Sequence, residues 1–192
     1  LMKRLISYFT KFEINLWMSS VLLIIISFCI FDRENSLTLL ASIIGATFLI
    51  LNAKGNPIGQ FLTRVFCILY GIISYGFSYY GEMITYLGMS MPMALFAFIS
   101  WLKNPYEKGK SEVKVNRLSK TETVFMIVLT MIVTVIFYFI LKYFNTANLI
   151  PSTLSVTTSF LAVYLTFRRS PYFALAYTMN DLVLIILWIL AS

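Results

Sequence analysis

The chain has 192 residues, of which 59% are hydrophobic and 12% charged, and its formal net charge is +7. It contains no histidine, which removes the commonest general base and metal ligand. The two cysteines, Cys29 and Cys67, are not spaced as a metal clip or redox pair, and no glycine-rich ATP-binding motif is present. We therefore expect no catalytic residue, no metal and no cofactor.

Seven long apolar runs follow one another along the chain. Because about 20 apolar helical residues cross a bilayer core of about 30 Å, each run is long enough to span a membrane. Backbone amides in lipid must be satisfied within the segment, so the runs are helices. The sequence predicts an all-α, polytopic membrane protein with seven transmembrane helices. The runs are residues 14–31, 37–53, 57–79, 82–102, 123–144, 149–167 and 171–191.

A charged segment at residues 103–122 separates the fourth run from the fifth. A short sequence pattern recurs in the parts before and after it. Lys54 and Arg168 end the second and sixth runs and are 114 residues apart, as are Pro57 and Pro171. This spacing favours a parallel internal repeat about an axis along the membrane normal. Because proline is common at the first helical position, two unrelated capped helices explain the pattern equally well.

Basic residues gather at one end of the predicted helices. With the N-terminus inside, inner segments hold 12 of the 15 lysine and arginine residues, and outer segments hold only Arg33 and Lys142. The positive-inside rule then predicts a multi-pass protein of the cell membrane with a cytoplasmic N-terminus. Anionic headgroups of the lipid bilayer account for the positive charge. The basic segment at residues 103–120 holds one aromatic residue, Tyr106, so we expect no nucleic-acid partner.

Three ionisable residues lie at membrane depth, where a charge costs about 2.5 to 3.5 kcal/mol on insertion scales. Glu82 opens the fourth run, where it can cap a helix N-terminus. Arg64 lies two turns into the third run, close enough to snorkel or to form a structural ion pair. Asp181 lies about 15 Å along the last run, too deep to snorkel. It faces either a polar cavity or Arg64, as a strut between two helices.

Polar and aromatic side chains recur at helical spacing in three runs. Thr153 and Thr157 share a face of the sixth run, and Glu82 and Tyr86 share one on the fourth. Together with the last run these faces predict a slot suited to a flat, polar aromatic solute. Hydroxyl groups also serve as ordinary packing contacts between membrane helices, which remains the alternative. The face of the last run holds Phe173, Tyr177, Asn180, Leu184 and Trp188.

Several short motifs together resemble the PnuC family of nicotinamide riboside (nicotinamide mononucleotide) transporters. They are NAKGNPIG at 52–59, YGEMITY at 80–86, WLKN at 101–104, YTMND at 177–181 and LW at 187–188. The resemblance covers most of the chain from about residue 37 onward. It departs from a Trp-x-x-Trp pair frequent in the family, which aligns here with Ala174 and Tyr177.

The resemblance implies a SWEET-like 3+1+3 core with an extra N-terminal helix and the last helix missing. On that scheme residues 1–36 form the extra transmembrane helix and 37–102 the first three-helix unit. Residues 103–122 form a cytoplasmic basic loop, 123–148 a linker transmembrane helix, and 149–192 an incomplete second three-helix unit. The missing helix and the leucine before Met2 suggest a fragment of a longer transporter.

The resemblance also implies a function. We expect facilitated diffusion of nicotinamide riboside or a related pyridine nucleoside with alternating access, which feeds NAD synthesis after a cytoplasmic kinase traps the substrate. A homo-oligomer is left open. The alternatives are a transporter of another aromatic vitamin such as thiamine, or a non-transporting membrane scaffold. An intramembrane enzyme is disfavoured, because such enzymes usually need several carboxylates or histidines at an aqueous face.

The chemistry of a pyridinium riboside assigns each candidate residue a task. Tyr177 and Trp188 would stack on the cationic ring, and Asn180 would hydrogen-bond the carboxamide or the ribose. Asp181 would offset the positive charge. Thr153 and Thr157 would serve the sugar hydroxyls. The remaining predicted substrate-binding residues are Phe173, Tyr86, Glu82 and Arg64.

Overall fold

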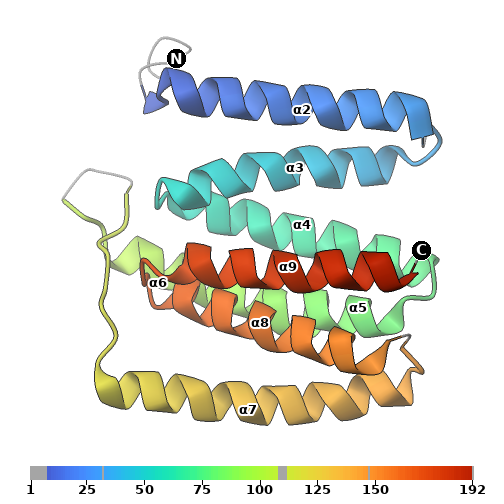
Figure 1. The fold of residues 1–192 in the computed structure, drawn as a ribbon. Coiled ribbons are helices and arrows are strands. Elements are labelled where there is room, and N and C mark those ends of the chain that lie inside the picture. The colour runs from blue at the N-terminus through green and yellow to red at the C-terminus, as the bar shows by residue number, and fades with distance from the viewer. Residues whose placement is uncertain (1–7, 32, 108–111, 147, 192) are drawn as a thin grey trace.

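The computed structural model describes residues 8–31, 33–107, 112–146 and 148–191, apart from the side chains of residues 188, 190 and 191. In this part of the chain all regular secondary structure is helical, as predicted, and the long helices lie roughly antiparallel to one another (Figure 1). The helices are α2 Lys11–Phe31, α3 Ser36–Ala53, α4 Pro57–Gly76, α5 Tyr80–Ile84, η1 Thr85–Ser90, α6 Met91–Lys103, α7 Lys120–Tyr143, α8 Leu149–Phe167 and α9 Phe173–Ala191.

The helices have the length and composition of membrane spans. Within the described residues, six spans are long and apolar enough to cross a bilayer, with α5, η1 and α6 counted as one, and α9 contributes a shorter apolar segment. Many large apolar side chains are exposed, among them Leu23, Met131 and Ile189. Exposed apolar surface on this scale requires lipid rather than water as the solvent. The prediction of a multi-pass membrane protein is confirmed.

Polar caps place the helix starts. The side chain of Asn35 accepts a hydrogen bond from the amide of Thr38 at the start of α3, and Asn56 caps α4 just before Pro57. Ser119 caps α7 by accepting from the amide of Glu122, so α7 begins at Lys120, three residues before the predicted run. The first turn of a capped helix can hold charged residues at the membrane surface. Because hydropathy detects only the apolar part, it places the start of such a helix too late.

The span from Tyr80 to Lys103 is continuous but irregular. Its middle, η1, is a π-helix, and Pro92 lies in the first turn of α6 directly after it. Proline has no amide hydrogen to donate, and its ring crowds the preceding turn, so the regular α-helical ladder is interrupted at this place. The wider turn absorbs the mismatch without breaking the span.

The helices pack as two groups that meet at α6 and α8. α3 and α6 both pack on α4, whereas α7 and α9 both pack on α8. The indole nitrogen of Trp101 in α6 donates to the carbonyl oxygen of Thr166 in α8 at 2.9 Å and joins the groups. α2 packs on α3 at one edge of the bundle, and none of its described side chains is buried (Figure 1).

The two turns noted in the sequence have matching structures. Gly55 and Arg169 both have left-handed backbone angles, with φ of 69° and 58°, and each is followed by a residue whose side chain caps the next turn. The segment at residues 112–119, which we call the strap, binds both turns. The amide of Val113 donates to the carbonyl oxygen of Gly55 at 2.9 Å, and that of Asn116 to Arg169 at 3.0 Å. The matching geometry favours the internal repeat.

Candidate functional site

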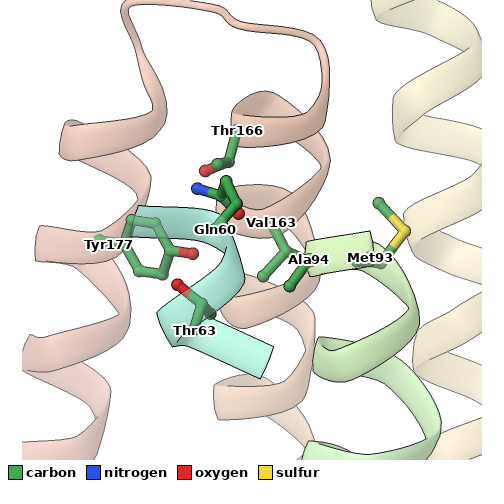
Figure 2. A pocket seen from close by; sticks show the side chains of 7 residues that line it. All are labelled: Gln60, Thr63, Met93, Ala94, Val163, Thr166 and Tyr177. Carbon is green, nitrogen blue, oxygen red and sulfur yellow. The ribbon is translucent and has the colours of Figure 1, made fainter. Parts of the chain in front are cut away.

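A small cavity lies where the two helix groups meet. Its volume is about 10 Å³, close to the least space that holds one water molecule. The walls come from α4, α6, α8 and α9, so both helix groups contribute (Figure 2). The lining residues are Gln60, Thr63, Met93, Ala94, Val163, Thr166 and Tyr177.

The α4 wall of this central cavity is a polar network. Gln60 is 2% exposed, and its amide nitrogen donates to the side-chain oxygen of Asn52 at 2.9 Å. The Asn52 amide donates in turn to the Thr63 hydroxyl at 3.3 Å. This contact requires Gly59, because a Cβ atom there would run into the side chain and backbone of Asn52. A close approach of α3 and α4 therefore holds Gln60 and Thr63 at the cavity.

The opposite wall comes from α8 and α9. The Thr166 hydroxyl donates to the carbonyl oxygen of Ala162 at 2.8 Å, and the Tyr177 side chain reaches Thr166. Figure 2 shows the Tyr177 ring directed from α9 toward Gln60 and Thr63. Among the described residues, no charged side chain lines the cavity. An aromatic ring with neutral donors and acceptors suits a polar aromatic solute and offers nothing to balance a phosphate.

Of the predicted face of α9, Tyr177 lines the cavity and Phe173 lies beside it. The two rings are in edge contact, with centroids 6.4 Å apart. Trp188 belongs to α9, but its side chain is outside the described part of the chain. The predicted face of α9 therefore meets the cavity near the N-terminal end of the helix.

Asn180 lies in the contact between α8 and α9 rather than at the cavity. It is 7% exposed, and its side-chain oxygen accepts hydrogen bonds from the hydroxyls of Thr158 at 2.8 Å and Ser159 at 2.9 Å. Hydroxyls spaced along α8 make a polar seam that a buried amide satisfies. A role for Asn180 in substrate binding stays a prediction. Because its side-chain oxygen is bonded to α8, the side-chain nitrogen is the group that would bind the substrate.

The predicted threonine face of α8 points toward α7. The hydroxyls of Thr157 and Thr134 are 2.8 Å apart, and Thr157 also contacts the carbonyl oxygen of Thr153 at 2.9 Å. The Thr153 hydroxyl donates to Leu149 within its own helix. These contacts match the packing alternative that the sequence left open.

The ionisable residues do not form the strut considered for Asp181. The side chain of Asp181 is exposed, and the described ion pairs do not include one between it and Arg64. Arg64 instead lies beside the rings of Phe61 and Phe98.

The predicted face of the fourth span gathers around a tyrosine. Tyr86 stacks at a tilt against Tyr70, with ring centroids 4.4 Å apart. Glu82, in the first turn of α5, is exposed and interacts with the same Tyr70. Neither Glu82 nor Tyr86 lines the central cavity.

Gln60, Thr63 and Thr166 are cavity residues that the sequence reasoning missed. On the third run that reasoning weighed only the ionisable Arg64, and on the sixth run it weighed only the face of Thr153 and Thr157. A glutamine in the middle of an apolar run is itself a signal, because its amide must find partners away from lipid.

Comparison with known proteins decides the family. The family model described as nicotinamide mononucleotide transporter matches residues 35–192. The chain belongs to this family. The match covers the central cavity and all helices from α3 to α9, and it starts after α2. The predicted resemblance to the PnuC family is thereby confirmed.

The fold of this nicotinamide mononucleotide transporter family member matches a solved structure. The structure is described as the crystal structure of the vitamin B3 transporter PnuC, and the TM-score is 0.79 at 22% sequence identity. The similarity covers 95% of this chain and 79% of the other. A comparison with curated protein sequences found no match. At this identity the structural similarity establishes the fold and leaves the solute to the chemistry of the site.

Proposed function

We propose that this protein carries nicotinamide riboside or a closely related pyridine nucleoside across the cell membrane, with its N-terminus in the cytoplasm. Transport would be facilitated diffusion with alternating access, and a cytoplasmic kinase would trap the solute for NAD synthesis. Support comes from the family membership and from the central cavity, which both helix groups line with uncharged polar side chains.

The position of Tyr177 is the observation that carries this proposal. Its ring lies in the cavity wall opposite Gln60 and Thr63, which supply neutral hydrogen-bonding groups (Figure 2). A pyridinium ring stacked on a tyrosine gains about 0.5 to 2 kcal/mol, and the carboxamide and sugar can bond to the amide and hydroxyl groups. These neutral contacts give the moderate affinity that lets a carried solute leave again.

The size of the cavity supports alternating access. Sites for small molecules have volumes of roughly 300 to 1,000 Å³, whereas this cavity has about 10 Å³. Binding therefore requires the two helix groups to move apart around Tyr177. Rocking of repeat units about a central site is the usual motion of carriers built in this way.

The decisive experiment measures uptake of labelled nicotinamide riboside into vesicles, with and without a kinase inside. Tyr177→Leu removes the ring, and we expect uptake about two- to thirtyfold slower, since stacking on the pyridinium is lost. Tyr177→Phe keeps the ring and is expected to retain most uptake. Thr178→Val, at the exposed neighbour on the same helix, is the matched control. Equal uptake by Tyr177→Leu and the control would contradict the proposal.

Competition by unlabelled solutes separates the remaining alternatives. The described residues of the cavity wall include no cation to balance a phosphate, so nicotinamide mononucleotide should compete weakly. Stronger competition by thiamine than by nicotinamide riboside would identify thiamine as the solute. A scaffold protein would show no saturable uptake of either compound.

A further inference from the structure

Arg64 is half-buried at the border between the buried and the lipid-facing sides of α4, and it does not line the central cavity. It is seven residues from Pro57, about 10 Å along the helix. Phe61 and Ile68, the residues three before and four after it, are 46% and 42% exposed. Gln60 and Cys67, four residues before and three after it, are buried. One flank of Arg64 therefore faces the hydrocarbon region, about two turns from the end of α4 where the strap lies.

Two aromatic rings hold the guanidinium group of Arg64. Its Cζ atom is 5.3 Å from the ring centroid of Phe61 on α4 and 4.8 Å from that of Phe98 on α6. The two ring centroids are 6.3 Å apart, so the rings lie side by side against the guanidinium group, and they contribute no charge.

The charge of Arg64 has no counterion in the described part of the chain. Its Nε atom is buried without a hydrogen-bond partner, and neither described ion pair includes it. The sequences of α4 and α6 contain no acidic residue. A guanidinium at membrane depth keeps its charge and requires an anion or water within reach of its side chain.

We propose that Arg64, packed beside Phe61 and Phe98, binds the phosphate group of an anionic phospholipid. The ligand lies in the leaflet next to the turn between α3 and α4. Headgroup phosphates are the anions that a lipid-facing arginine reaches by extending toward the membrane surface. The guanidinium fork matches phosphate oxygens in two parallel hydrogen bonds. Lys103, exposed at the end of α6 on the same side of the membrane, favours an anionic lipid over a zwitterionic one.

Native mass spectrometry of the purified full chain tests this site with phosphatidylglycerol and phosphatidylcholine as probes. We expect wild type to retain phosphatidylglycerol, and Arg64→Gln to retain it roughly tenfold less, as for loss of a charge-assisted pair. Arg117→Gln removes the same charge from an exposed position at the same end and is the matched control, expected to bind like wild type. Phosphatidylcholine should be retained weakly by all three proteins.

A second variant keeps the test decisive if Arg64→Gln folds poorly. Phe98→Leu retains the charge but removes one ring, and we expect phosphatidylglycerol retention about threefold below wild type. Equal retention by Arg64→Gln and Arg117→Gln would overturn the proposal. So would displacement of the lipid by inorganic phosphate. A change of oligomeric mass in Arg64→Gln without lipid loss would assign this face to a second copy of the chain.

Discussion

A single glycine sets how closely the first two helices of the core approach. Gly59 in α4 lies against Asn52 in α3, and a Cβ atom at this position would come within 2.8 Å of the Asn52 backbone nitrogen. The contact also places Gln60 and Thr63 at the cavity, because Asn52 bonds to both of their side chains. The residue therefore links helix packing to the chemistry of the site.

Gly59→Ala should destabilise the protein by about 1 to 3 kcal/mol, since the added methyl group forces α3 away from α4. The measurement is thermal unfolding in detergent. Gly76→Ala is the matched control in the same helix, because a Cβ atom there meets nothing within 4 Å. Equal melting temperatures for the two variants would show that the contact does not limit the packing.

Asn180 illustrates at the same scale why helix faces were hard to predict. Its spacing from Tyr177 suggested a shared cavity face, yet Thr158 and Ser159 bond its side chain within the α8–α9 contact. Lipid-facing and core-facing positions of a membrane helix are both apolar, so hydrophobicity does not mark the inner side. The rotation of each helix about its own axis decides which hydroxyl bonds to which amide. The hydrophobic pattern of a single sequence does not indicate that rotation.

At the scale of elements, the sequence predicts which helices exist better than it predicts where they end or where they depart from regular α-helix. Every predicted run corresponds to a helix, and six of the described spans are long and apolar enough to cross a bilayer. The start predicted at Pro57 agrees with the cap at Asn56, whereas the cap at Ser119 places the start of α7 three residues before the predicted run. Hydropathy does not predict the π-turn of η1 that precedes Pro92.

α2 is an appendage to the core. Its described links to α3 and the turn after it include a bond from the Trp17 indole to the Thr47 hydroxyl and an ion pair between Glu13 and Lys54. It also precedes the region matched by the family model. A chain of residues 35–192 should therefore fold and transport within about twofold of the full chain, because surface contacts of this kind contribute little.

Uptake and thermal unfolding of the two chain lengths, side by side, check this expectation. The full chain carrying Trp17→Phe is a useful control, since it loses the bond to Thr47 but keeps the helix. Unfolding of the shorter chain under conditions in which this control stays folded would show that α2 is part of the core.

At the scale of the whole molecule, the strap connects the turns of the two helix groups on one side of the membrane. Its amides at Val113 and Asn116 bond to Gly55 and Arg169, which occupy matching places in the repeat. If the groups separate on that side during transport, one of these bonds must break. The strap then favours the state that is closed there.

Asn116→Pro removes one donor of the strap and should shift the equilibrium toward the state open on that side by about two- to tenfold. Spin labels at the exposed positions Ile58 and Tyr172, beside the two turns, report the separation through their distance distribution. Val115→Pro is the control, because Val115 is 60% exposed and its amide forms no bond among the described backbone contacts. Identical distributions for the two variants would refute a closing role for the strap.

The hydrogen bond from Trp101 to Thr166 makes Trp101 an intrinsic fluorescent probe of the contact between the two helix groups. The indole is 2% exposed and donates across the boundary between the two helix groups. When α6 and α8 part, the ring enters a more polar environment and its fluorescence emission moves to longer wavelength. With Trp17 and Trp188 replaced by phenylalanine, a stopped-flow trace of this emission would time the opening in an unlabelled protein.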